Sequence, residues 1–212
     1  MDLTFRCRCG ALQGVVRDAS PTGGHRAICY CDDCQTAAHA LDGGASLDEH
    51  GGSDIFQVPP RSVSLTQGVE HLRCLRLGPK GLLRWYAGCC DTPLANCLPT
   101  PRSPFVGVQA GAFVLPEGAS RDDALGPVRL RVMGAYAKGG CPPGAAPRFR
   151  ITEGGPVARL LLRSVLRGLH RPSPFFDPST GAMRATPRVL TREARNEARA
   201  KAGQPPLPTT PR

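Results

Sequence analysis

The sequence has few aromatic residues, very little lysine and no long apolar run. Aromatic residues make up only 5% of its 212 residues, and a core short of aromatics buries less area per residue, so a bound metal would help to stabilise it. No stretch approaches the roughly 20 apolar residues of a transmembrane helix, and the N-terminal residues contain no apolar run typical of a signal peptide. We therefore expect a cytoplasmic protein that does not enter a membrane.

The charge of the chain is strongly positive, and arginine supplies most of it. The net charge is +10 and the pI is about 9.5, whereas only Lys80, Lys138 and Lys201 are lysines. A basic protein favours nucleic acid, anionic lipid or an acidic small ligand. No compact basic block occurs, so we expect most arginines to be solvated surface charge and regard a nucleic-acid partner as the less favoured alternative.

The turn-forming residues point to a mainly β fold. The 25 glycines and 22 prolines favour short strands joined by turns over a helical bundle. Apolar residues alternate over 72–77 and recur over 82–86, and Gly78–Gly81 forms a turn between them, which predicts an antiparallel hairpin. We expect a domain of antiparallel strands over residues 1–140, with further strands at 105–108 and 128–132.

The C-terminal third of the chain has a different pattern. A glycine- and proline-rich stretch at 139–144 marks a boundary, and residues 156–170 have the apolar spacing of a helix. We therefore predict a helical extension over 141–190. Residues 191–212 are expected to form a charged helix followed by a proline-rich disordered tail.

Cysteines carry the strongest functional signal in the sequence. Seven of the ten cysteines fall in three tight groups, whereas Cys74, Cys97 and Cys141 stand apart and are expected to pack as small hydrophobic residues. The grouped cysteines are Cys7 and Cys9, then Cys29, Cys31 and Cys34, then Cys89 and Cys90. Because cytoplasmic thiols stay reduced and Zn²⁺ takes four ligands at tetrahedral corners, we predict that these groups hold one or two zinc ions and form no disulfides.

Three motifs resemble those of the glutathione-dependent formaldehyde-activating enzyme family, which also includes centromere protein V. The motifs are Cys7–Gly10, Cys29–Cys34 and Trp85–Pro93. This resemblance covers about residues 1–140 and implies a small zinc-containing β structure called the β-tent. The helical extension lies outside it.

The resemblance also implies two kinds of zinc site. One is structural, and its ligands would include Cys7, Cys9 and Cys90. The other is catalytic: it would have three protein sulfurs and one open position, as catalytic zinc sites do. Its ligands would be Cys29, Cys31 and Cys34.

The chain departs from the family pattern at three positions. Ala87 stands where the late cysteine pair has its first cysteine, Asp91 stands where a glycine follows, and Tyr30 stands where the family often has histidine. The fourth ligand of the structural zinc is therefore either Cys89 or Cys97. Adjacent cysteines are awkward ligands for one metal, because successive side chains of an extended chain point apart.

Two functions follow from these features. The first is a carbon–sulfur lyase-type activity on adducts of aldehydes with a small thiol such as glutathione, in which Arg26 and Arg84 would bind carboxylates. The alternative is a non-catalytic zinc module that binds a protein or nucleic-acid partner. It would use an arginine stripe on the predicted helix, in which arginines recur every four residues at Arg159, Arg163, Arg167 and Arg171.

Overall fold

The computed structural model describes residues 1–149 and 155–208. These residues form two β-sheets and four α-helices, so the predicted mainly β class is confirmed. None of the described helices is long and apolar enough to cross a membrane. The last residues of the predicted disordered tail, 209–212, lie outside the described part of the chain.

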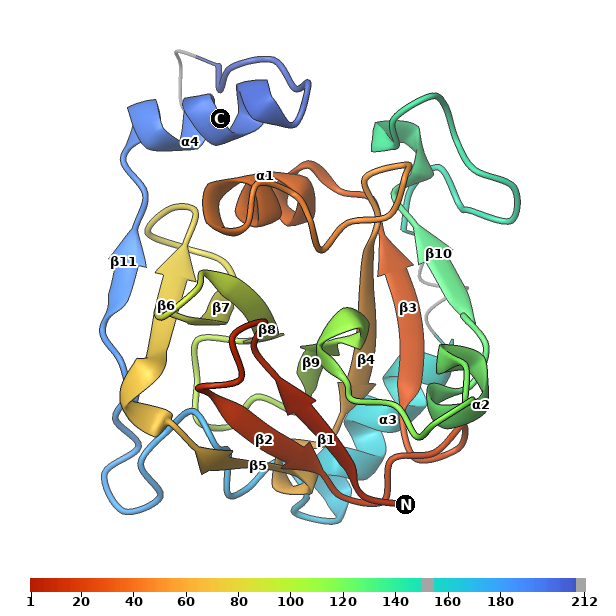
Figure 1. The fold of residues 1–212 in the computed structure, drawn as a ribbon, viewed down its shortest axis with the longest axis vertical. Helices are drawn as coiled ribbons and strands as arrows, with labels where there is room; N and C mark the ends of the chain where they lie inside the picture. Colours follow the sequence, from red (N-terminus) through yellow and green to blue (C-terminus); the bar gives the residue numbers. More distant parts are fainter. Residues whose placement is uncertain (150–154, 209–212) are drawn as a thin grey trace.

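The larger sheet has the strand order β10-β3-β4-β9-β8-β7-β6-β11 (Figure 1). The strands are β3 (His25–Cys29), β4 (Ser53–Val58), β6 (Leu72–Arg76), β7 (Leu83–Ala87), β8 (Thr92–Cys97), β9 (Val106–Gln109), β10 (Leu130–Val132) and β11 (Pro187–Val189). The predicted hairpin is confirmed, because β6 pairs with β7 in antiparallel register. The two edge strands depart from the predicted antiparallel pattern, because β10 pairs with β3 and β11 pairs with β6 in parallel register. Each follows a long connection, which a parallel pairing requires.

A smaller sheet carries the N-terminus of the chain. It consists of β1 (Leu3–Arg6), β2 (Gln13–Val16) and β5 (Val63–Gln67), paired antiparallel in the order β1-β2-β5. Each buried side chain of β1 and β2 alternates with a more exposed one, as expected for a sheet with one face on the core. Figure 1 shows this sheet crossing in front of β9 and β4.

The helices lie at the ends and on the far side of the sheets. They are α1 (Asp32–Leu41), α2 (Arg121–Leu125), α3 (Gly155–Leu166) and α4 (Arg192–Lys201). The charged helix at the C-terminus is confirmed, and the Ala194 amide donates to Oγ1 of its predicted N-cap, Thr191. The predicted 156–170 helix is α3, which ends at Leu166. Val165 and Leu166 belong to the apolar spacing that predicted this helix, and both are exposed.

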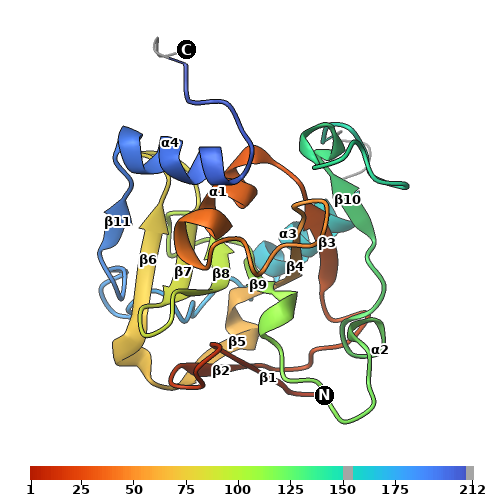
Figure 2. The same ribbon diagram turned by 45° about the horizontal axis from the view of Figure 1, so that its top comes forward.

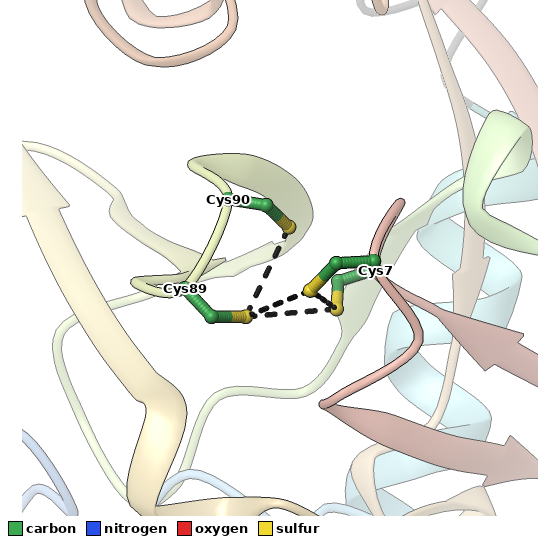
Figure 3. A group of neighbouring side chains, drawn as sticks. Cys7, Cys89 and Cys90 are labelled. Carbon is green, nitrogen blue, oxygen red and sulfur yellow. Dashed lines mark hydrogen bonds between the residues drawn. The ribbon is translucent and has the colours of Figure 1, made fainter.

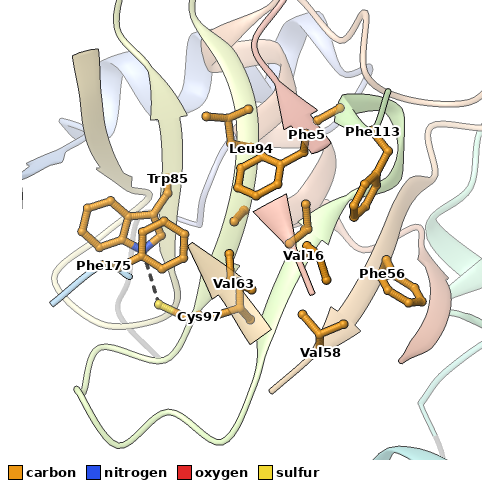
Figure 4. Close-up of a cluster of buried hydrophobic side chains, with 14 of the residues drawn as sticks. Phe5, Val16, Phe56, Val58, Val63, Trp85, Leu94, Cys97, Phe113 and Phe175 are labelled. Carbon is orange, nitrogen blue, oxygen red and sulfur yellow. Dashed lines mark hydrogen bonds between the residues drawn. The ribbon is translucent and has the colours of Figure 1, made fainter. Parts of the chain in front are cut away.

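The predicted extension shares the core of the predicted β domain. Trp85 on β7 is fully buried, and its ring stacks on Phe175 with 4.7 Å between centroids (Figure 4). Phe176 packs edge-on against the same indole at 6.4 Å. The Trp85 Nε1–H donates to Cys97 Sγ at 3.3 Å. Residues on both sides of position 140 therefore bury apolar surface together, and β11 adds a further strand to the sheet.

Candidate metal centre

The first cluster consists of Cys7, Cys9, Cys89 and Cys90. Two turns supply it: the loop between β1 and β2 holds the first pair, and the turn between β7 and β8 holds the second. In the first turn the Gly10 amide donates to the Cys7 carbonyl at 3.0 Å. Gly10 has φ +78°, a conformation that glycine adopts without steric cost. Figure 3 shows Cys89 and Cys90 facing the loop of Cys7.

The sulfur separations of the first cluster fit one tetrahedral metal ion. Cys7 Sγ lies 3.5 Å from Cys9 Sγ and 3.8 Å from Cys89 Sγ. Cys9 and Cys89 are 3.3 Å apart, and Cys89 and Cys90 are 3.9 Å apart. Metal–sulfur bonds of about 2.3 Å at tetrahedral angles place sulfurs about 3.8 Å apart. All four cysteines are free, so the donor set matches a metal site and not a disulfide.

The adjacent cysteines both reach the cluster because the chain turns between β7 and β8. Residues 88–91 form a turn in which the Cys90 amide donates to the Ala87 carbonyl at 3.3 Å, and Asp91, directly after the pair, has φ +53°. The backbone here is therefore not extended, and the rule that successive side chains point apart does not apply. Cys97, the other predicted fourth ligand, lies outside the cluster and is buried in the core beside Trp85. The sequence-based expectation of awkward ligands holds only for an extended chain, and the turn at this point removes it.

Hydrogen bonds around the first cluster stabilise negative charge on sulfur. The Leu12 amide donates to Cys7 Sγ at 3.3 Å, and Thr92 Oγ1 lies 3.0 Å from Cys90 Sγ. Burial raises the pKa of Cys90, but the contacts with Thr92 and Cys9 outweigh it and lower this pKa to about 6. For Cys89, desolvation and the neighbouring thiols raise the pKa to about 12. One thiolate is thus favoured without a cation, and a metal would be needed to hold four.

The second cluster consists of Cys29, Cys31 and Cys34, whose sulfurs all lie within 4.8 Å of one another. Cys29 ends β3, Cys31 is the N-cap residue of α1, and Cys34 lies in its first turn, where its amide donates to the Cys31 carbonyl at 3.0 Å. The Cys31 side chain makes no capping hydrogen bond. The strand-to-helix transition therefore brings the three predicted residues together and leaves their sulfurs available to a metal.

Arg84 on β7 supplies positive charge beside the second cluster. Hydrogen bonds with Cys29 and Cys31 lower the pKa of Cys34, burial opposes them, and the charge of Arg84 lowers this pKa further. Hydrogen bonds with Cys31 and Cys34, together with burial, raise the pKa of Cys29. Without a cation, only one of these three cysteines is favoured as a thiolate. A cation would be needed to stabilise three thiolates together, so the donor set fits a metal.

The C-terminal helix holds the segment between the cysteines of the second cluster. Arg195 on α4 pairs with Asp33 at 2.9 Å, and the buried Arg199 pairs with Asp32 at 3.4 Å. Gln204 Nε2 donates to the Asp32 carbonyl at 3.2 Å. Figure 2 shows α4 lying along α1. This contact was not predicted from the sequence, although the acidic pair inside the cysteine motif and the arginines of the last helix carry complementary charge.

Removal of α4 should therefore loosen the second cluster. We expect Arg199→Gln to weaken metal binding there by about 10- to 100-fold, the usual effect of losing a group that orients a metal ligand, and to leave the first cluster loaded. Deletion of 191–212 should act in the same direction and leave the β core folded, because the large buried aromatic residues precede it. Competition with a chelator, followed for the two metal ions separately, measures the metal affinity of each cluster.

Lys201→Gln provides the control, because Lys201 lies on the same helix but pairs only with Glu197 in the exposed i,i+4 position. It removes one positive charge, as Arg199→Gln does. Equal metal affinities in the two variants would contradict the role assigned to Arg199.

A cleft of about 920 Å³ lies beside the first cluster and is lined by Cys7. A small adjoining cavity shares Ser46, Pro93 and Gln109 with it and reaches Cys34. The arginines that line the cleft are Arg6, Arg8, Arg26, Arg121 and Arg131. The cleft and its side cavity thus contact both clusters, and basic side chains line much of the cleft.

Arg26, predicted to bind a ligand carboxylate, is instead committed to the fold. It is buried, and it pairs with Asp54 at 2.8 Å and also with Asp122 and the Gly126 carbonyl. The Asp54 hydrogen bond is the main reason that the pKa of Arg26 is raised. Arg26 therefore joins α2 to the sheet, and the other arginines of the cleft are the ones left to meet a ligand.

The fold and the two clusters define a mainly β protein with paired thiol sites that could hold metal. Residues 2–184 match the model of a family of unknown function, DUF6151, so the chain belongs to this family. The search of curated proteins gave no match. A crystal structure of a Rhodobacter sphaeroides protein aligns with a TM-score of 0.38 and 16% identity, over 55% of this chain and 90% of that one.

Proposed function

We propose that the protein binds two zinc ions, one in each cysteine cluster, within a β-tent fold like that of the glutathione-dependent formaldehyde-activating enzymes. Thiolates are soft ligands, and sites built only from them favour zinc over magnesium, calcium or manganese. The supporting observation is the sulfur geometry of the first cluster, with separations of 3.3 to 3.9 Å. Such clusters need reduced thiols, and we propose the cytoplasm as the compartment that provides them.

The two sites would differ in role because they differ in ligand number. The first cluster offers four sulfurs and so closes the coordination sphere, as structural zinc sites do. The second offers three, which leaves one position for a ligand from solution. This difference matches the division into a structural and a catalytic site that the family resemblance implies.

The proposed activity is of the carbon–sulfur lyase type, on adducts of an aldehyde with a small thiol such as glutathione. In the cleaving direction the carbon–sulfur bond breaks, the sulfur keeps the electron pair, and the adduct hydroxyl loses its proton to give the aldehyde. Zinc in the second cluster would stabilise the released thiol as thiolate at neutral pH. The observation that carries the proposal is that the cleft and its side cavity contact both clusters.

The chain's own residues would bind and orient the thiol. Arg84 lies beside the second cluster in the side cavity, where its charge favours a nearby thiolate. Arg8, Arg121 and Arg131 line the cleft and are suited to carboxylates, because the guanidinium group pairs with them in a bidentate manner. Glutathione carries two carboxylates as well as its thiol, so this arrangement of charges suits it.

Glutathione binding to the wild type and to Cys31→Ser tests the proposal. We expect the variant to lose the second metal and with it all measurable glutathione binding by isothermal titration, while the first metal and the fold persist. Cys141→Ser is the matched control, because Cys141 is an exposed cysteine outside both clusters. Equal binding by wild type and Cys31→Ser would exclude a mechanism through the second cluster.

The alternative function, a non-catalytic zinc module, draws support from α3. Leu162 and Leu166 on this helix are 59% and 75% exposed, next to the exposed Arg163. An exposed apolar strip between arginines is typical of a surface that binds a partner. If both metals are bound and no thiol binds, this second function is the one to pursue.

A further inference from the structure

A separate cavity of about 490 Å³ lies against β5, away from both cysteine clusters. Figure 1 shows β5 at the opposite end of the fold from α4. One wall is β5 itself, and the other is the segment from Pro172 to Pro178. None of its lining residues lines the cleft or the side cavity beside the clusters. The cavity is therefore independent of the proposed thiol site.

Three arginines from distant parts of the chain line this cavity. Arg17 follows β2, Arg61 lies in the 3-10 turn Pro60–Ser62, and Arg184 comes from the predicted extension. No acidic residue lines the cavity, and no carboxylate pairs with these arginines within the described part of the chain. Like charges gathered around one space repel each other, and a bound anion would relieve that repulsion.

The arginine-lined cleft beside the first cluster provides a contrast. There Asp42, Asp48, Asp54 and Asp122 line the same walls as the arginines. Asp54 and Asp122 pair with Arg26, so the protein itself compensates part of the positive charge. In the β5 cavity, the negative charge that compensates the arginines has to come from an anion in solution. This difference in charge balance, and not the presence of arginine alone, marks the β5 cavity as an anion site.

The remaining walls are mostly apolar and define the other part of the ligand. Apart from Ser64 and Ser173, they are formed by Val63, Leu65, Val69, Pro172, Pro174 and Pro178. Apolar walls with a few converging polar groups are typical of small-molecule sites. We propose that this cavity binds a small organic anion, in which one carboxylate or phosphate group meets the arginines while an apolar body packs against the valines, the leucine and the prolines.

Titration with three probes tests the proposal on the metal-loaded full-length protein. Phenyl phosphate and benzoate carry the two candidate acid groups on an apolar ring, and inorganic phosphate has no apolar body. We expect at least one of the two aromatic anions to bind, and inorganic phosphate to bind about 10-fold more weakly or not at all. Which aromatic anion binds more tightly identifies the acid group. Equal binding of inorganic phosphate and phenyl phosphate, or no binding of any probe at millimolar concentration, would overturn the proposal.

Variants locate the binding. Arg61→Gln and Arg184→Gln should each weaken binding by about 10-fold or more, because each loses a charge-assisted hydrogen bond. Arg102→Gln changes an exposed arginine between β8 and β9, outside the cavity, and is the charge-matched control that should bind as the wild type does. An equal loss in this control, or loss of binding in Cys31→Ser but not in Arg61→Gln, would place the anion elsewhere.

Discussion

Cys7→Ser is expected to lose the metal of the first cluster and to unfold at a much lower temperature. The cluster joins the loop after β1 to the turn between β7 and β8, so its metal would link two segments more than 80 positions apart in the sequence. Metal binding to a site that exists only in the folded chain stabilises the fold directly. We expect a loss of about 4 kcal/mol or more in the free energy of unfolding. Metal content per chain and thermal unfolding measure the two effects together.

Two other cysteines provide the controls for this experiment. Cys141→Ser alters an exposed cysteine outside both clusters and should leave metal content and unfolding unchanged. Cys97→Ser alters the buried acceptor of the Trp85 hydrogen bond and should keep the full metal content, even if the core is less stable. Loss of metal from Cys97→Ser, or a fully loaded Cys7→Ser, would show that the first cluster has been assigned the wrong ligands.

Phe175→Ala should destabilise the protein about as strongly as Cys7→Ser, because it removes a buried aromatic ring from the core. The Phe175 ring is 1% exposed and stacks on the only tryptophan with 4.7 Å between centroids. Truncation of a buried phenylalanine leaves a cavity and costs about 3–5 kcal/mol. Urea unfolding of the variant should show a lower midpoint with an unchanged slope.

Phe149→Ala is the matched control, because Phe149 is the same residue type but 52% exposed. Its effect should stay within about 0.5 kcal/mol, as for most surface substitutions. Similar stabilities of the two variants would show that residues after 140 do not support the core.

By the same argument, a chain that ends at residue 140 should fail to fold, because it lacks Phe175, Phe176 and the edge strand β11.

Local patterns in the sequence were enough to predict most elements of the fold. The hairpin over 72–86 is specified by alternation and a glycine-proline turn, both of which act over a few residues. The last helix begins at its predicted N-cap, Thr191, because capping is a contact between near neighbours. The helix over 156–170 was placed correctly but extended too far, since apolar spacing continues past Leu166 where the helix ends.

The sequence by itself determined that seven cysteines gather in tight groups, and the spacing within each group already implied that neighbouring sulfurs can share a ligand. Only the tertiary structure decided that Cys89 joins Cys7 and Cys9 while Cys97 turns into the core, because this depends on one turn with a left-handed residue, Asp91. Likewise, the pairing of Asp32 with Arg199 and the meeting of Arg17, Arg61 and Arg184 around one cavity join residues far apart in the chain. Contacts between residues so far apart in the sequence depend on the chain topology, so local sequence propensities cannot predict them.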